Sequence, residues 1–435
     1  MKSIQVFEGQ ELKTEPPSPS VPAGARCQFV GSGLDGKDVT VSLSEETLSR
    51  HMLFLGGIGT GKTNAIVQLL SQLRGTMAEN DVMVIFDTKG DFYREFYRPG
   101  DIVLGNDAKA TGPEGVDYWN IFRELGTGDA LESNILEIAK MLFQEKLQKT
   151  SQPFFPNAAK DLFCGILTDF VRKGAVEDMN NAKLRAFLDQ TPSSELRAML
   201  QAHVDMKAMV NYIADDRSPQ TQGVISELQQ TIREILIGNF KKPGTLSIRE
   251  CIRNKGARCI FIEYDLGIGN MLTPIYRLLL DLAIKEALCR ERSEGNVWFV
   301  IDEFRLIPNL QHIDNGVNFG RSLGAKFIIG VQNVEQIFHS YDESLARSIL
   351  SGFMTAVAFR VNDSTTREFI QGVFGKNRKK DTYMASVQTR GIVESVRDAN
   401  VVEDWDIAGL CTGQAIIGMP GQLPFHLQFK KHTRE

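Results

Sequence analysis

The sequence predicts an α/β fold in which a mainly parallel sheet, covered by helices, is interrupted by an inserted all-α domain. Two observations support this prediction. Near both ends of the chain, short apolar runs that end in polar residues alternate with segments of helical spacing, which is typical of parallel sheets buried on both faces. Between residues 119 and 242 the strand-like runs disappear and helical periodicity replaces them.

The composition is that of a globular protein without a global basic surface. Hydrophobic residues make up 42% of the 435 residues and charged residues 24%, which excludes wholesale disorder. The net charge is −5, so any contact with DNA would come from a local patch or from a pore formed on assembly. The six cysteines include no Cys-x-x-Cys pair, which disfavours a zinc module and a disulfide framework.

The chain divides into four stretches by residue pattern. Residues 1–24 end in a proline-rich run, which predicts an extended linker or a strap across a neighbour. Residues 25–118 and 243–435 carry the strand–helix alternation, whereas breakers divide residues 119–242 into several helices of an all-α domain. The clearest predicted elements are the strands Val39–Leu43, Met52–Leu55, Asp81–Phe86, Ala257–Glu263, Asn296–Ile301 and Ala325–Val331, and the helices Asn64–Leu73, Asn134–Leu142 and Ala158–Val171.

A glycine-rich motif lies between the predicted strand Met52–Leu55 and the helix that begins near Asn64. It is a complete G-x-x-x-x-G-K-[ST] sequence, formed by Gly56, Gly57, Ile58, Gly59, Thr60, Gly61, Lys62 and Thr63. Its glycines let backbone N–H groups face phosphate oxygens, Lys62 reaches the β- and γ-phosphates, and Thr63 offers a hydroxyl to Mg²⁺. Because a helix N-terminus also favours anions, we predict that residues 56–64 bind ATP and that the two α/β stretches form one nucleotide-binding domain. A chance match in a glycine-rich turn is the alternative.

Two adjacent acids follow a predicted strand, as a phosphate loop requires for Mg²⁺ and for water. Asp302 and Glu303 come after the apolar run Val297–Ile301, in the order of a Walker B aspartate with a neighbouring catalytic glutamate. We predict that Asp302 assists the metal, together with Thr63, and that Glu303 polarises water. Asp87 also ends a strand but has no directly following carboxylate. A helix-capping role is the alternative for the Asp302–Glu303 pair.

Three further polar segments are candidates with weaker signals. Gln332 ends the strand Ala325–Val331, where a side chain could sense the γ-phosphate, although a glutamine there is often simply exposed. Arg321 lies just before the same strand, as a solvated charge or as an arginine finger. The run 376–380 has four basic residues in five, and it predicts either a solvated loop or a surface that faces DNA.

Together these pieces resemble the type IV coupling ATPases of bacterial conjugation (the TraD/TraG type), within the FtsK–HerA group of RecA-like P-loop motors. The resemblance covers His51 to about Gln428. It rests on an ordered series of motifs, namely His51–Thr63, Ile85–Phe92, Trp119–Phe122, Phe299–Phe304, Gly330–Asn333 and Leu410–Pro424. This order, with a helical domain between the P-loop and the Asp302–Glu303 pair, makes the match specific.

The resemblance implies a ring, usually a homo-hexamer, with ATP at subunit interfaces and DNA through the centre. It makes Gln332 the sensor of the γ-phosphate and Arg321 the finger that enters the neighbour's site, so both join Lys62 and Glu303 as catalytic residues. The helical insertion matches the all-α domain through which relatives meet the relaxase, the relaxosome or secretion-channel proteins.

Two features differ from the family's usual pattern. Members typically start with two transmembrane helices, whereas no stretch here approaches about 18 uncharged apolar residues. We therefore expect a soluble, cytoplasmic chain without direct membrane insertion, with recruitment to the inner membrane by a partner as a further location. Ser344 stands where some relatives carry a basic residue, with Arg347 one turn later.

Three functions are open at this point. The first is an ATP-driven DNA translocase, or coupling protein, that recruits DNA or nucleoprotein for conjugative transfer. The second is a soluble HerA-like DNA motor that works with a nuclease in repair or phage defence. The third is an adaptor whose nucleotide only stabilises assembly; the intact Lys62, Asp302 and Glu303 argue against it, because a scaffold needs no hydrolytic acid.

Overall fold

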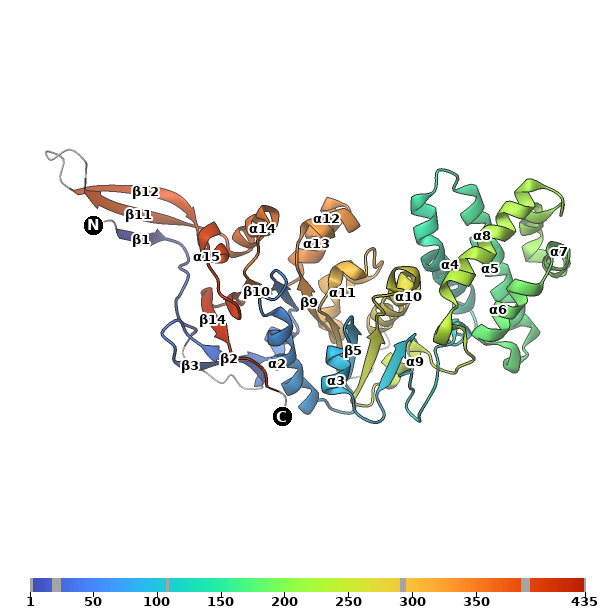
Figure 1. Ribbon diagram of the computed structural model, residues 1–435, viewed down its shortest axis with the longest axis horizontal. Coiled ribbons are helices and arrows are strands. Elements are labelled where there is room, and N and C mark those ends of the chain that lie inside the picture. Colours follow the sequence, from blue (N-terminus) through green and yellow to red (C-terminus); the bar gives the residue numbers. More distant parts are fainter. Residues whose placement is uncertain (1–2, 18–24, 107–108, 290–294, 385–391, 434–435) are drawn as a thin grey trace. The chain divides into compact units, whose positions relative to one another are not determined.

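The computed structural model describes residues 3–17, 25–106, 109–289, 295–384 and 392–433. The chain forms two compact units (Figure 1). The first contains both ends of the chain, Met1–Phe86 and Arg290–Glu435, and the second contains Asp87–Cys289. Residues 18–24, which include part of the proline-rich run, lie outside the described residues.

Five neighbouring strands of the first unit are parallel and form its core. Their order across the sheet is β10 (Thr355–Phe359), β4 (Met52–Leu55), β9 (Ala325–Val331), β8 (Val297–Ile301) and β5 (Val82–Asp87). Every residue of these strands is buried. Burial on both faces explains why the four of them that the sequence analysis predicted read as continuous apolar runs and not as alternating ones.

Four antiparallel strands extend this sheet beyond β10. In order they are β13 (Gln414–Gly418), β14 (Phe425–Phe429), β2 (Ala25–Ser32) and β3 (Asp38–Ser44). In β2, β3 and β14, buried residues alternate with partly exposed ones, as in a sheet whose second face is less covered. Of the four, only β3 was predicted, because strands of mixed polarity give a weak pattern.

A separate three-stranded sheet carries the basic run, with β11 (Lys376–Met384) between β1 (Ser3–Glu8) and β12 (Ile392–Asn400). The predicted loop at residues 376–380 is therefore wrong, and part of the expected N-terminal linker is the strand β1. Three of the four basic side chains of this run pair with acids, Arg378 with Glu8 and Asp398, Lys379 with Glu403, and Lys380 with Glu394. These ion pairs leave little free positive charge for a DNA-facing patch.

Helices flank the large sheet of the first unit and connect its strands. They are α1 (Glu45–Leu48), α2 (Lys62–Gly75), η5 (Phe304–Leu306), α11 (Ile313–Phe319), η6 (Gly320–Leu323), α12 (Glu335–Ser340), α13 (Glu343–Ser351), α14 (Ser364–Phe374) and α15 (Asp404–Ala408). Helix α2 packs along β2, where Gln68 and Gln72 exchange hydrogen bonds with backbone groups of that strand.

The second unit combines a parallel strand pair with a helical region. Strands β6 (Ile102–Gly105) and β7 (Arg258–Glu263) are paired, and α3 (Asp91–Phe96), α9 (Ile248–Asn254) and α10 (Gly269–Ala287) belong to the same unit. The helical region contains η1 (Ile121–Glu124), α4 (Ala130–Lys149), α5 (Phe154–Lys173), η2 (Val176–Asp178), α6 (Asn181–Gln190), α7 (Ser193–Gln201), η3 (Val204–Ile213), α8 (Pro219–Ile235) and η4 (Gly238–Lys241).

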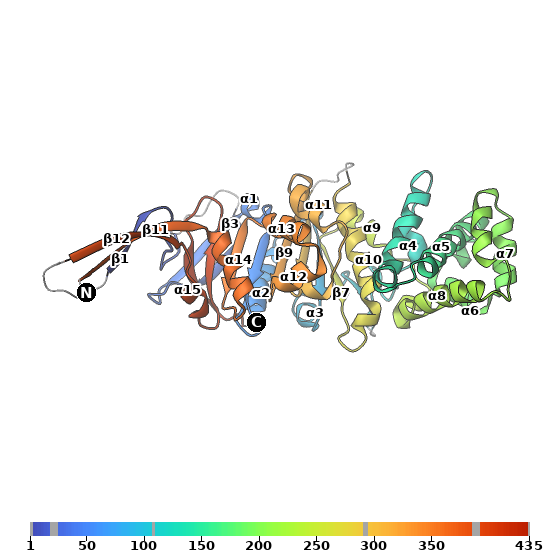
Figure 2. The same cartoon turned by 90° about the horizontal axis from the view of Figure 1, so that it is seen from above.

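Residues 119–242, all of them described, contain helices and no strand. Helices α4, α5 and α8 pack together (Figure 2), and the rings of Phe143 and Phe163 lie 5.9 Å apart between the first two. The boundaries of the predicted insertion stay a prediction, since the compact unit extends from Asp87 to Cys289. No helix within the described parts of the chain is long and apolar enough to span a membrane.

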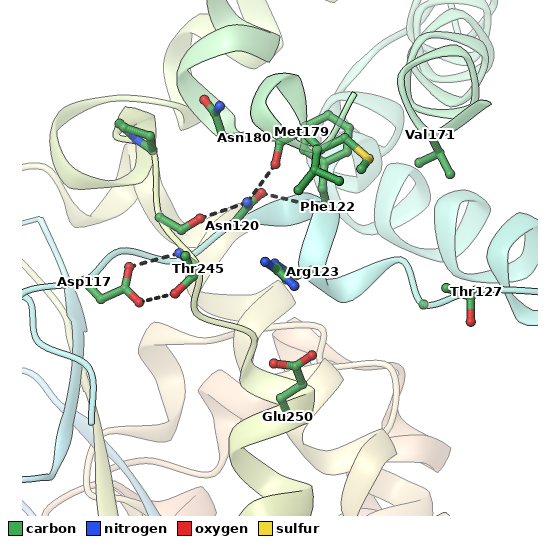
Figure 3. A pocket seen from close by; sticks show the side chains of 14 residues that line it. Asp117, Asn120, Phe122, Arg123, Thr127, Val171, Met179, Asn180, Thr245 and Glu250 are labelled. Carbon is green, nitrogen blue, oxygen red and sulfur yellow. Dashed lines mark hydrogen bonds between the residues drawn. The ribbon is translucent and has the colours of Figure 1, made fainter. Parts of the chain in front are cut away.

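Two chain segments run side by side at the base of the helical region. Asn120 donates its backbone N–H to the Leu246 carbonyl at 3.0 Å, and Leu246 donates to the Tyr118 carbonyl at 3.1 Å. The fully buried carboxylate of Glu124 accepts the indole N–H of Trp119 at 2.9 Å, and burial raises its pKa. A cavity of about 600 Å³ opens beside these two paired segments and is lined by residues of both, among them Asn120 and Thr245 (Figure 3).

Candidate nucleotide-binding site

The glycine-rich loop connects the carboxyl end of β4 with the start of α2, which begins at Lys62. Strand β4 lies between β10 and β9, so the loop sits at the carboxyl edge of the parallel strands. Ligands of parallel α/β sheets bind at this edge. The predicted order of strand, loop and helix is therefore present.

Backbone hydrogen bonds anchor the loop to segments far away in the sequence. Gly56 donates to the Val331 carbonyl at 3.1 Å, Gly57 donates to the Arg360 carbonyl at 2.9 Å, and the Thr60 carbonyl accepts from Gly413 at 2.8 Å. Sequence reasoning missed Arg360 and Gly413 as neighbours of the loop. The only signal was indirect, because the closing segment Leu410–Pro424 belongs to the motif series that carried the resemblance.

Two glycines of the loop have conformations that other residues would adopt only under strain. Gly59 and Gly61 have φ angles of 71° and 116°. A Cβ atom at Gly61 would also come within 3.0 Å of the Cα atom of Gly413, and one at Gly56 within 2.7 Å of the Cβ atom of Phe359. The glycines of the motif therefore hold the loop in one specific backbone conformation, which disfavours a chance match in a glycine-rich turn.

Lys62 lies inside the loop, where its side chain is only 6% exposed. Its Nζ atom donates to the carbonyls of Gly56 at 2.5 Å and Gly57 at 3.2 Å. The described first turn of α2 contains no acidic side chain, and its N-cap Gly61 has none to offer the N–H groups. A buried ammonium beside the N-terminus of a 14-residue helix fits a polyphosphate.

Thr63 and Asp302 meet although 239 positions separate them. The Oγ1 atom of Thr63 donates to Oδ2 of Asp302 at 2.6 Å. Asp302 directly follows β8, and Gly330 of the neighbouring β9 allows the approach, because a Cβ there would come within 2.2 Å of the Asp302 carbonyl oxygen. A hydroxyl beside a carboxylate is the oxygen ligand set that Mg²⁺ prefers.

Glu303 forms a second contact at the same edge. Gln332, which follows β9, donates its side-chain N–H to Oε2 of Glu303, and the Nε atom of Arg305 donates to Oε1 at 2.9 Å. Although Glu303 occupies the N-cap position of η5, its described side chain does not bond the N–H groups of that helix. The helix-capping alternative is therefore not supported.

Asp87, the competing acid, ends β5 with a buried side chain. Its two carboxylate oxygens accept backbone N–H groups of its own following turn, from Lys89 at 3.2 Å and from Tyr93 at 2.8 Å. Burial raises the pKa of this carboxyl group. These bonds give Asp87 a local structural role that Asp302, with its contact to the loop threonine, does not share.

The side chain of Asn64 faces the C-terminal segment. Its Nδ2 atom donates to the Lys430 carbonyl at 2.9 Å, and its Oδ1 atom accepts from the N–H of His432 at 2.7 Å. Only the backbone of Asn64, at the start of α2, therefore remains for the phosphate contact that its motif position predicts. Gln68, one turn later, also donates to the Lys430 carbonyl, so the C-terminal segment is attached to α2 at two residues.

Arg321 lies on η6 at the amino end of β9, whereas Gln332 and the loop lie at the carboxyl edge. The seven residues of β9 separate the two ends by about 23 Å at roughly 3.3 Å per residue. The Arg321 side chain is 53% exposed and pairs with Glu46 at 3.6 Å. The structure thus brings Lys62, Thr63, Asp302, Glu303 and Gln332 to one edge and leaves Arg321 outside it.

A family model described as the type IV secretion-system coupling protein DNA-binding domain matches residues 38–427. The coupling protein TraD of Escherichia coli strain K12 is 24% identical over an alignment of 437 residues, which covers 92% of this chain and 56% of TraD. The coupling protein VirD4 of Bartonella henselae is 22% identical over 315 residues, which cover 69% of this chain and 49% of VirD4. The chain spans about half the length of these curated relatives.

Solved structures have the same fold. The unbound monoclinic form of the bacterial conjugative coupling protein TrwBΔN70 has a TM-score of 0.74 at 19% identity, over 91% of this chain and 88% of that one. TrwB in complex with ADP and Mg²⁺ has a TM-score of 0.72 at 17% identity, over 100% and 96% of the two chains. The predicted RecA-like P-loop fold with a mainly parallel sheet is therefore confirmed.

The match extends well beyond the phosphate loop, which occurs in many unrelated families. The family model begins in β3 and ends in β14, so it includes the parallel strands, the helical region and the acids after β8. The TrwB likeness covers 91% of this chain. Because residues 38–427 match as one family unit, this chain belongs to the type IV secretion-system coupling proteins.

Proposed function

We propose that this chain is an ATP-hydrolysing DNA motor that recruits DNA or nucleoprotein for conjugative transfer through a type IV secretion system. The observation that carries the proposal is the 2.6 Å contact between Thr63 and Asp302. It joins a phosphate-binding loop to a metal-binding carboxylate, as phosphoryl transfer requires. TrwB, a structural relative, was solved with ADP and Mg²⁺ and with a non-hydrolysable ATP analogue, which supports the same ligands here.

In this proposal, Lys62 and the N–H groups at the start of α2 hold the phosphates. The hydroxyl of Thr63 and the carboxylate of Asp302 hold Mg²⁺, which when bound neutralises part of the phosphate charge. Glu303 orients the attacking water and accepts its proton. Gln332, which donates a hydrogen bond to Glu303, keeps that carboxylate in orientation and responds to the γ-phosphate.

Glu303→Gln should separate binding from turnover. The amide keeps the size and most hydrogen bonds of the side chain but cannot accept the proton, so kcat should fall by roughly 10²-fold or more while ATP still binds. Phosphate release and titration with a fluorescent ATP analogue measure the two quantities. Glu343→Gln is the matched control, because this side chain of α13 is exposed, and it should leave both quantities unchanged. An equal loss of binding and turnover would instead assign Glu303 a structural role.

We further propose that the site is completed by a second copy of the chain. Arg321 is separated from its own loop by the length of β9, so its guanidinium can assist only a nucleotide on another copy. A contact of this head-to-tail kind closes into a ring when the rotation allows it. A homo-hexamer, as the family resemblance implies, is the assembly that we propose.

DNA would then bind in the pore of that ring. The net charge is −5, and three of the four basic residues of β11 are paired with acids, so a larger basic surface would have to form by assembly. The helical region would recruit the relaxase, relaxosome or channel proteins. It exposes large apolar side chains, among them Leu136, Val176 and Val204, which suit a protein partner.

Steady-state ATPase assays with and without DNA test the proposed function. We expect turnover that requires Mg²⁺, increases with protein concentration as rings form, and is stimulated by single- or double-stranded DNA. An adaptor that uses nucleotide only for assembly would bind ATP without turnover. The family and its relatives favour conjugation over the HerA-like alternative; stimulation by a cognate nuclease and not by a relaxase would reverse that preference.

A further inference from the structure

His51 occupies an unusual position between α1 and β4. It is 1% exposed, and its φ angle of 59° lies in the left-handed region. Non-glycine residues seldom adopt this conformation, although histidine and asparagine do so more often than most. The residue stands at the amino end of β4, whose other end leads into the phosphate loop. A buried, strained polar residue at such a point needs a specific partner to hold it.

The first partner is the amino end of β9. The Nδ1 atom of His51 accepts the backbone N–H of Phe327 at 3.2 Å. The parallel β4–β9 ladder begins with Met52 opposite Ile328, so the imidazole continues the pairing one residue beyond the strand. The ring also packs edge-on against the ring of Phe327, with centroids 5.2 Å apart, and tilts against Phe353 at 6.1 Å.

A second neighbour of the ring lies on α11. Burial lowers the pKa of His51 to about 4, and the charge of Arg321 acts in the same direction, so the ring is neutral near pH 7. Since Nδ1 accepts a hydrogen bond, the proton of the neutral ring is on Nε2. Among the described residues Nε2 has no hydrogen-bond partner of ordinary geometry, and the Val317 carbonyl is the backbone group that acts on the ring.

The two neighbours of the ring lie on either side of Arg321 in the sequence. Phe327, which donates to the ring, follows the arginine by six residues, and Val317, whose carbonyl affects the pKa of His51, precedes it by four. The Arg321 side chain forms an exposed ion pair with Glu46, 65% of whose side chain is open to solvent. Exposed pairs of this kind stabilise a conformation only weakly. The buried contact of His51 with Phe327 acts together with a backbone bond at the end of the segment, where Val297 donates to the Gly324 carbonyl at 3.0 Å.

We propose that His51 is a positioning residue that, through its contact with β9, helps to hold the segment 318–324 and thereby aims Arg321 at the nucleotide of a neighbouring copy. The inference rests on the proposed function, because it needs Arg321 to act between copies. Transition-state stabilisation depends steeply on geometry, since a displacement of about 1 Å can cost roughly 10²-fold in rate. The contacts given above for His51 are with Phe327 and Phe353 and not with its own phosphate loop, so we expect it to act only through the arginine.

The first experiment compares two substitutions. His51→Ala removes both nitrogens, and kcat should fall by roughly 10-fold to 10²-fold with KM for ATP unchanged. His51→Asn tolerates a positive φ and keeps an acceptor near the place of Nδ1, so it should recover most of the rate. The control is His426→Asn, a half-buried histidine of the first unit in β14, which should leave kcat unchanged. Circular dichroism and ATP binding verify that each variant is folded.

The second experiment asks on which copy His51 acts. His51→Ala subunits have an intact phosphate loop, and Lys62→Ala subunits have an intact finger loop, so mixing them should restore turnover where the two meet. The double variant His51→Ala/Arg321→Ala should be no slower than Arg321→Ala. If mixing restores nothing while the double variant loses the product of both effects, His51 acts on its own site or on the fold, and the inference is overturned.

The same assays separate this inference from the proposed function. If Arg321→Ala is as active as wild type, the shared site itself fails. If Arg321→Ala loses activity and complements Lys62→Ala but His51→Ala does neither, the shared site stands and the role of His51 fails.

Discussion

Lys62→Ala should abolish ATP hydrolysis and weaken nucleotide binding. The buried ammonium faces the inside of the loop, with Nζ 2.5 Å from the Gly56 carbonyl, where the phosphates are expected to lie. Without it, phosphate charge in the loop is no longer compensated, in the ground state or in the transition state. We expect kcat/KM to fall by roughly 10³-fold or more, since charge stabilisation at preorganised sites is a dominant part of catalysis.

The measurement is phosphate release at saturating Mg²⁺, with ATP affinity from a fluorescent analogue. Lys37→Ala is a suitable control, because that lysine is 85% exposed, pairs with Asp35 in a turn, and should leave both quantities unchanged. The free energy of unfolding shows whether the Lys62 variant is intact. Hydrolysis at a near wild-type rate in a folded Lys62→Ala protein would refute the assignment of the phosphate loop.

Arg321→Ala should lose most of its turnover while ATP binding is retained. A guanidinium supplied to the transferred phosphoryl group accelerates such reactions by roughly 10³-fold or more. Because Arg321 is remote from its own loop, the loss should be complemented between copies. Mixing Arg321→Ala with Lys62→Ala subunits should restore some activity, since intact loops then meet intact fingers at part of the interfaces.

Glu46→Gln is the matched control for this arginine. This substitution breaks the ion pair between Glu46 and Arg321 but keeps the guanidinium, so ATP turnover should not fall as it does in Arg321→Ala. Specific activity should also rise with protein concentration as the shared sites assemble. A rate that does not depend on protein concentration, together with an Arg321→Ala protein as active as wild type, would rule out a site between copies.

The central part of the fold was predictable because its signals are local. Strands β4, β8 and β9 are buried on both faces and therefore appear as unbroken apolar runs between helices. Strands β2, β13 and β14 were missed because their polarity is mixed and because β2 and β14, like β10 and β13, pair across long stretches of sequence. Their stability depends on partners that a single strand does not reveal.

Strand β11 shows the same limit most clearly. Its charged residues favour a loop in isolation, yet acidic side chains on β1 and β12 stand beside them, including Glu8 and Glu394. Cross-strand pairs of opposite charge stabilise such a sheet and also neutralise the run. Whether the basic side chains are paired with acids could be answered only after the register of the three strands was known.

Sequence by itself determined the phosphate loop, because eight consecutive residues with glycines at fixed positions specify one backbone shape. It also indicated that Asp302, Glu303 and Gln332 follow parallel strands. Only the tertiary structure decided which acid meets Thr63, that Gln332 bonds Glu303, and that the side chain of Asn64 is used by the C-terminal segment. It also placed Arg321 at the far end of β9. These facts depend on strand order and register, which are set by the packing of segments hundreds of residues apart and not by any local pattern.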